Sequence, residues 1–224
     1  MSTPPKSSRE LWWDARTAWP MTVLSVVFLG VYSLAILWES APRDAVIGLR
    51  VSMIVIWVVF LADYVVRAVL SARPLTFVAT HKVDALTVIV PFLRPLRILQ
   101  YLQNLSYFRQ ASGAAVRTRI LIVAGGYAIL FVWMIALLEL NVERHAPGAT
   151  ITSIGDALWW ASVTITTVGY GDTYPVTPLG RVLAIVLMAG GLAIVGTVTG
   201  TIISYIGERI KLPGVSTTKS TDQN

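Results

Sequence analysis

Cysteine is absent from the 224 residues of this chain, and charged residues are scarce at 13%. Without cysteine, the chain can form neither disulfides nor thiolate metal sites. The two histidines, His81 and His145, are far apart and lack a nearby acidic cluster, so solvated loop positions are a simpler interpretation than a metal site. Soluble domains carry roughly 25% charged residues. The deficit of charge, together with a hydrophobic content of 55%, predicts a membrane protein.

The charges that are present are mostly basic and give a formal net charge of +6. In a soluble protein this excess would suggest a nucleic-acid partner, but membrane proteins concentrate Lys and Arg in their cytoplasmic loops. If both termini are cytoplasmic, the outer loops hold only four basic residues, Arg43, Arg50, Arg144 and Arg181. We therefore expect a multi-pass protein of the cell membrane, in contact with lipid, with both termini inside and no nucleic-acid partner. The Ala-, Val-, Gly- and Arg-rich composition suggests a bacterial source.

Six segments are predicted to be membrane helices, although the third is too short to span a bilayer alone. They cover about residues 20–38, 45–70, 83–90, 91–110, 119–140 and 182–206. A cleaved signal peptide is the alternative for the first segment, but its apolar run is longer than the roughly 7–15 residues usual in such peptides. A break or a surface helix is expected at 112–114, and an outer loop at 141–151.

The stretch 166–172, which reads Thr-Thr-Val-Gly-Tyr-Gly-Asp, lies between the last two long apolar segments. A short helix is predicted just before it, at 153–165. Glycine at every second place lets a strand turn all its carbonyls to one side, and a ring of such strands can replace the water around K⁺. A Gly-Tyr-Gly tripeptide alone is common in turns. However, non-helical backbone at membrane depth is tolerated only inside protein or along a watery cavity, which favours an ion-binding interpretation.

The pore stretch 156–172, Asp-Ala-Leu-Trp-Trp-Ala-Ser-Val-Thr-Ile-Thr-Thr-Val-Gly-Tyr-Gly-Asp, resembles the pore of prokaryotic voltage-gated-type potassium channels. The similarity continues through 174–177 and, more weakly, over about 20–207. It implies an all-α membrane protein, a homotetramer in which each chain has six transmembrane helices, a re-entrant pore helix and a selectivity filter. The implied division is a cytoplasmic N-terminal segment (1–19), a four-helix voltage-sensor-like domain (20–110), a pore domain (111–211) and a disordered tail (212–224).

The resemblance also implies roles for individual pore residues. The filter would comprise residues 167–172, with K⁺ as the permeant ligand and no other cofactor, and K⁺ would be bound by carbonyls of Thr167, Val168, Gly169 and Tyr170 and by the Thr167 hydroxyl. Gly171 and Asp172 would complete the filter.

Four further residues are expected to support or move this filter. Asp172 would bond to a pore-helix tryptophan, which we expect to be Trp160 with Trp159 beside it. Glu139 would hold the outer end of the fifth helix to the pore. Gly190 would be a flexible point of the sixth helix, although simple helix packing explains glycines there equally well.

Ionisable residues at membrane depth suggest a sensor of the membrane field. Phe60 and Asp63 in the second helix, and Asp84 in the third, match the sites that receive positive charges in voltage-sensor domains, and Arg67 can pair with Asp63 at i, i+4. In such domains the fourth helix carries Arg or Lys at every third position, a series called the arginine ladder. Three of the six corresponding positions here are neutral: the series reads Arg94, Arg97, Gln100, Gln103, Ser106 and Arg109.

The size of this ladder predicts weak or absent voltage dependence. One charge crossing the field is worth about 2.3 kcal/mol per 100 mV. Two outer arginines in each of four subunits would supply at most roughly 18 kcal/mol per 100 mV, against roughly 28–37 for three to four charges. Arg94 and Arg97 could instead simply snorkel to the outer interface.

The leading interpretation is therefore passive, K⁺-selective conduction with little voltage gating. A fully voltage-gated channel that uses Arg94, Arg97 and Arg109 is the first alternative. A potassium carrier would need four pore-like loops in one chain, and a non-selective or purely structural subunit would not need an intact filter. No nucleophile–base pair stands out, so we expect neither an enzyme nor a small-molecule substrate. With so few residues outside the membrane part, we expect any regulation to come from that part, lipid, pH or another protein.

Overall fold

The computed structural model describes residues 8–71 and 113–210 of the chain, and all regular structure in these ranges is helical. The helices in order are α1 (Ser8–Leu37), α2 (Arg43–Leu70), α6 (Gly113–Glu143), α7 (Ile154–Ile165) and α8 (Pro178–Ile210). All except the short α7 are long and apolar enough to cross a membrane. The all-α class is thereby confirmed. The expected third and fourth segments, 83–90 and 91–110, and the tail 212–224 lie outside the described residues.

Helix α1 begins at Ser8, well before the expected start of the first span, and carries Pro20 in its interior. Proline lacks an N–H and disturbs the preceding turn, but membrane helices tolerate it where Ser and Thr side chains bond to the backbone nearby. The carbonyl that Pro20 leaves without its helical donor is that of Arg16. Two hydroxyls bond to other carbonyls nearby: Thr17 donates to Trp13 at 2.9 Å, and Thr22 donates to Ala18 at 2.8 Å. The stretch apolar enough to span begins at Ala15.

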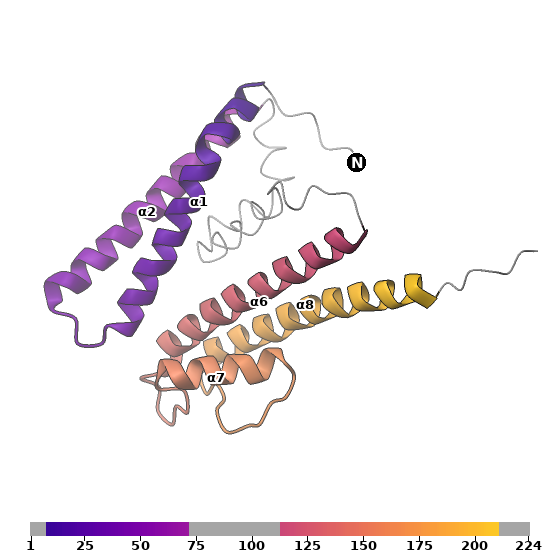
Figure 1. The fold of residues 1–224 in the computed structure, drawn as a ribbon. Helices are drawn as coiled ribbons and strands as arrows, with labels where there is room; N and C mark the ends of the chain where they lie inside the picture. The colour runs from indigo at the N-terminus through magenta and orange to yellow at the C-terminus, as the bar shows by residue number, and fades with distance from the viewer. Residues whose placement is uncertain (1–7, 72–112, 211–224) are drawn as a thin grey trace, which may run out of the picture.

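Helices α1 and α2 form an antiparallel pair, and α1 also contacts the pore half of the chain (Figure 1). Phe60 is fully buried between the two helices and lies against Phe28, with ring centroids 6.3 Å apart. Met134 of α6 joins the same apolar cluster. A second link is polar, because the indole Nε1 of Trp133 donates to Ser33 Oγ at 3.1 Å.

The second half of the described chain is built from α6 and α8, which run side by side, and from α7, which packs on both of them near one end (Figure 1). Their shared core includes Leu140, Ile151, Trp160 and Leu187, each almost completely buried. Helix α6 continues to Glu143, so the first residues of the expected outer loop are helical. It also begins at Gly113, where we expected a break or a separate surface helix.

Two adjacent glycines allow α8 to approach its neighbours closely. A β-carbon on Gly190 would overlap the ring of Phe131 in α6, and one on Gly191 would meet Ile165, the last residue of α7. Helix α8 is continuous through both positions. The contacts support the packing interpretation of these glycines, while bending at Gly190 stays a prediction.

We expect Gly191→Ala to lower the stability of the folded protein by about 1–3 kcal/mol, the usual cost of overpacking. Its β-carbon would lie 2.8 Å from Ile165 Cγ1 and 3.2 Å from the Ile165 carbonyl oxygen, and the carbonyl belongs to the backbone at the end of α7. Gly48→Ala in α2 is the matched control, because a β-carbon there meets nothing within 4 Å. Thermal unfolding in detergent should show a lower Tm for Gly191→Ala alone. Equal Tm values would contradict tight packing at this point.

Candidate functional site

The site begins with the firmly anchored start of helix α7. The Ser153 hydroxyl accepts from the Asp156 backbone N–H at 3.2 Å, and the Asp156 carboxylate accepts from the Ser153 N–H at 2.9 Å, which forms a capping box. Such reciprocal bonds satisfy N–H groups that the first turn of a helix leaves free. The helix then runs to Ile165 and directs its C-terminal end, which carries partial negative charge, toward the stretch that follows.

The backbone of residues 167–171 alternates in handedness. Thr167, Gly169 and Gly171 have φ angles of 62°, 57° and 77°, and among the described non-glycine residues Thr167 is the only one with positive φ. Alternation of this kind turns successive carbonyls toward one side. A positive φ is strained for a β-branched residue, so the surroundings must hold Thr167 in place.

One carbonyl at the end of α7 holds much of this backbone. The N–H groups of Val168 and Gly169 both donate to the carbonyl of Val163, at 2.9 and 3.1 Å, and the Thr167 N–H donates to Thr164. Val168 and Tyr170 are 53% and 67% exposed in the single chain. Residues 167–171 thus form a short extended strand whose backbone is held by hydrogen bonds to the C-terminal end of α7.

The aromatic support differs from the expectation at one residue. The indole Nε1 of Trp159, rather than Trp160, donates to Asp172 Oδ2, at 2.7 Å. The Trp159 ring also stacks on Tyr170, with centroids 5.5 Å apart and planes within 5° of parallel. Trp160 is instead buried in the core.

Helical periodicity explains this correction. Adjacent residues point about 100° apart on a helix, so only one of the two tryptophans can face the filter. Trp160 shares the face of the buried residue Ala157, one turn earlier. Apolar spacing alone could not assign the two roles, because Val163, one turn after Trp159, is buried as well.

The expected role of Glu139 is also corrected, because Glu143 ties α6 to the segment after the filter. The Glu143 carboxylate accepts from the backbone N–H groups of Val176 and Thr177, each at 2.9 Å, and from the Thr177 hydroxyl at 2.6 Å. Glu139 is completely buried one turn earlier, and its oxygens have no hydrogen-bond partner among the described residues. The two glutamates lie on one helix face, so spacing alone could not decide between them.

A second contact that the sequence did not predict fixes the same segment. The Thr150 hydroxyl donates to the Tyr174 carbonyl and accepts from the Tyr174 N–H, both at 2.8 Å. With Glu143, this threonine connects the chain just after Asp172 to the helices on either side. No motif marked Thr150, since it lies in the outer loop.

Asp63 in α2 is surrounded by partners from its own helix and from α1. Its carboxylate accepts from Trp13 Nε1 at 3.1 Å and from Arg67 Nε at 3.0 Å. Arg67 Nη2 also donates to the Thr17 hydroxyl at 2.9 Å. The expected pairing of Asp63 with Arg67 is thus confirmed. The other expected sensor residues, Asp84, Arg94, Arg97 and Arg109, lie outside the described residues.

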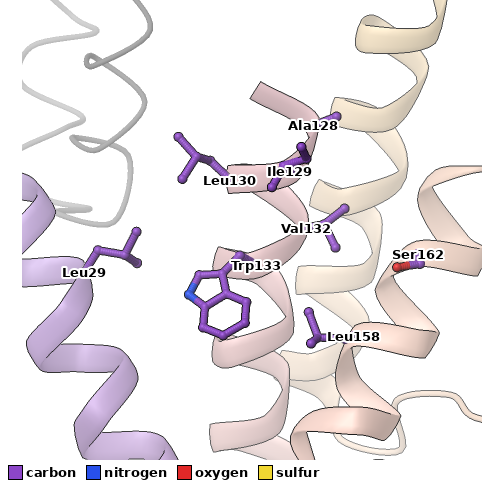
Figure 2. A pocket seen from close by; sticks show the side chains of 8 residues that line it. All are labelled: Leu29, Ala128, Ile129, Leu130, Val132, Trp133, Leu158 and Ser162. Carbon is purple, nitrogen blue, oxygen red and sulfur yellow. The ribbon is translucent and has the colours of Figure 1, made fainter. Parts of the chain in front are cut away.

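An apolar groove of about 590 Å³ is lined by side chains of α1, α6 and α7 (Figure 2). Its lining comes from Leu29, Ala128, Ile129, Leu130, Val132, Trp133, Leu158 and Ser162. Among the described residues, no charged side chain lines this groove, so these residues cannot compensate a dehydrated ion there. Nor do the described residues contain a cluster of side chains suited to a metal ion. The backbone oxygens of 167–170 remain the group suited to binding a cation.

The family is decided by two comparisons with known proteins. A model described as "Ion channel" matches residues 120–208, which include α7, the strand and almost all of α8. A voltage-gated potassium channel of Aeropyrum pernix is 32% identical over 206 residues, which are 80% of this chain and 66% of that protein. The chain belongs to the prokaryotic voltage-gated-type potassium channel family.

Two further similarities cover a smaller share of the chain. A calcium-gated potassium channel of Thermoplasma volcanium is 40% identical over 78 residues, which are 35% of this chain and 22% of that protein. The present chain therefore covers less than two thirds of the length of each of these two relatives. A solved pore module of a voltage-gated K⁺ channel shares 37% identity and covers 44% of the chain and 99% of the module, with a TM-score of 0.36. That score is too low to establish a common arrangement of the helices.

We expect Trp159→Phe to reduce sustained ion current strongly. Phenylalanine keeps a ring for Tyr170 but removes the donor to Asp172, and hydrogen bonds to charged groups contribute about 1.5–3 kcal/mol. Single-channel recording should show brief openings or none, while size-exclusion chromatography shows unchanged assembly. Thr166→Ser is a control that keeps a hydroxyl able to bond to Ser162. Unaltered open times in Trp159→Phe would contradict the bracing role.

The capping box predicts a loss of stability in acid. The Ser153 hydroxyl, with smaller effects of backbone bonds from Ser153 and Thr152, holds the pKa of Asp156 below its usual value of 3.8. A lowered folded-state pKa contributes stability above the unfolded value and loses it as pH falls through the folded value. Asp156→Asn should therefore flatten the acid side of the stability curve, measured as Tm at several pH values. The capping-box role would be refuted by identical acid dependence in the variant and the parent protein.

Proposed function

We propose that this protein is a potassium-selective channel that conducts K⁺ passively across the cell membrane, with weak or absent voltage dependence. The observation that carries the proposal is the alternating backbone of 167–171, anchored to Val163 and braced by the Trp159–Asp172 bond. Carbonyls of Thr167, Val168, Gly169 and Tyr170, with the Thr167 hydroxyl, would form the ion sites. Rings of such carbonyls replace the hydration shell of K⁺.

A ring of carbonyls requires more than one chain, and we propose a homotetramer around a central pore. Each copy would contribute one strand, so the exposed Val168 and Tyr170 would face neighbouring copies. Helix α8 also exposes apolar side chains along its length, namely Val182, Ile185, Met188, Leu192, Val195 and Ile203. Such a surface is suited to other copies and to lipid rather than water. Chemical cross-linking and native mass spectrometry would measure the number of copies directly.

The C-terminal end of α7 supports cation binding independently. Its partial negative charge would point toward the pore from each of the four copies, which favours a cation before it enters the filter. The membrane orientation that fits this arrangement places both termini in the cytoplasm, in agreement with the excess of basic residues predicted on that side. No cofactor, enzymatic step or small-molecule substrate is needed for passive conduction.

The environment of Asp63 supports weak voltage dependence. Both of its oxygens are already engaged, one by Trp13 and the other by Arg67. A carboxylate compensated by an arginine on its own helix attracts a moving positive charge less strongly. The alternative is a fully voltage-gated channel that uses Arg94, Arg97 and Arg109, and measurement of open probability against voltage separates the two.

Purified protein in planar bilayers with opposing K⁺ and Na⁺ solutions should give a reversal potential close to that for K⁺. The physical reason is that a rigid carbonyl cage matched to K⁺ compensates Na⁺ less well. Gly169→Ala is the variant to compare, because alanine resists the positive φ at this position and should remove selectivity or current. A reversal potential near zero for the parent protein would refute K⁺ selectivity.

In the same bilayers we expect open probability to change little across a wide range of voltage. Two outer arginines in each of four subunits limit the energy available from the field to roughly 18 kcal/mol per 100 mV, and less if they move only partway. A steep response, flattened by Arg94→Gln and Arg97→Gln, would instead establish the voltage-gated alternative while leaving the selectivity result untouched.

A further inference from the structure

Glu139 is a buried acidic residue that the conduction pathway does not use. It is completely shielded from solvent, and neither carboxylate oxygen has a hydrogen-bond partner among the described residues. An ionised carboxylate in such a place would lose its hydration without compensation, which costs several kcal/mol. Something must therefore neutralise this group.

The neighbour best placed to do so is Glu143, one helical turn away and also completely buried. A β-carbon placed on Gly180 would overlap the Oε1 atoms of both Glu139 and Glu143. Gly180 lies in the first turn of α8, and only glycine leaves room there for both carboxyl groups. The two Oε1 atoms are consequently close to each other.

No cation among the described residues is placed to compensate this pair. In the part of the chain that the structure describes, the charged group beside Glu139 is Glu143, which contacts the same position on Gly180. Arg144, which directly follows α6, pairs with Glu39 at 3.2 Å, and Arg181 in the first turn of α8 is exposed. Asp156, at the start of α7, is engaged by Ser153 and Thr152.

We propose that Glu139 is a protonated carboxylic acid whose O–H donates to Glu143, so that the two residues act as one proton-sharing brace behind the outer end of the filter. Like charges a few ångströms apart in a buried site cannot both ionise. Glu143 already uses both of its oxygens as acceptors of three hydrogen bonds from Val176 and Thr177. The proton therefore belongs on Glu139, and the acid–carboxylate bond is of the strong, charge-assisted kind.

The proton links the brace to pH. When base removes it, two buried negative charges face each other and repel, and the segment from Val176 to Gly180 is the part that can move away. The folded state binds a proton that the unfolded chain releases at neutral pH, so stability should fall as pH rises. Glu139 is thus a positioning residue that acts on the filter through Glu143.

Infrared spectroscopy of the full-length protein in lipid tests the proton directly. At neutral pH we expect the carbonyl stretch of a protonated carboxyl group in the parent protein and its absence in Glu139→Gln, which keeps an N–H donor but cannot ionise. Glu39→Gln is the control, since the Glu39 side chain is 69% exposed and should contribute no such band. If the parent protein shows no protonated-carboxyl band at neutral pH, or if Glu139→Gln retains it, the proposal is overturned.

Potassium current is the functional readout, and this test depends on the proposed function. Raising the pH on the outer side should reduce the current of the parent channel and leave that of Glu139→Gln unchanged. An equal alkaline loss in both would show that Glu139 is not the titrating group. If no K⁺ current is seen at any pH, the proposed function fails while the infrared test still decides the carboxyl pair. If Glu139→Gln does not assemble, loss of the parent protein's band in alkali supports the pair and its persistence refutes it.

Discussion

The strand 167–171 depends on the hydrogen bonds made behind it, because its own backbone forms neither helix nor sheet. Two N–H groups share the Val163 carbonyl, and Trp159 holds Asp172 at the outer end. These bonds stabilise a positive φ at Thr167 that a β-branched residue would otherwise avoid. The short helix α7 is therefore the platform of the site, and its capping box and buried face matter because they set where that platform lies.

A second layer of polar contacts surrounds this platform. Glu143 binds the chain after the filter, Thr150 holds Tyr174 from the outer loop, and Gly180 lets α8 begin directly against the two glutamates of α6. Buried polar groups are costly unless satisfied, so such a network specifies one arrangement of loop and helices more strongly than apolar packing would. Glu139 is the member of this layer whose satisfaction requires a proton, which is how pH could reach the filter.

The α1–α2 pair is linked to the pore half through apolar and polar contacts alike. Phe28 and Met134 share one cluster, and Trp133 bonds to Ser33. Within the pair, Asp63 is compensated locally by Trp13 and Arg67 rather than left open. This arrangement holds α1 against both α2 and α6, which is consistent with a supporting role for these helices.

The sequence by itself determined the helical membrane class, the position of α7 and of the non-helical stretch after it, and the Asp63–Arg67 pair, because hydrophobic periodicity and short-range spacing are local properties. It did not determine that α1 starts at Ser8, because propensity alone argues against a helix through Pro20. Only the tertiary structure decided between Trp159 and Trp160 and between Glu139 and Glu143. Each choice depends on which side of a helix meets a segment distant in the chain, and that is set by how α6, α7 and α8 pack together.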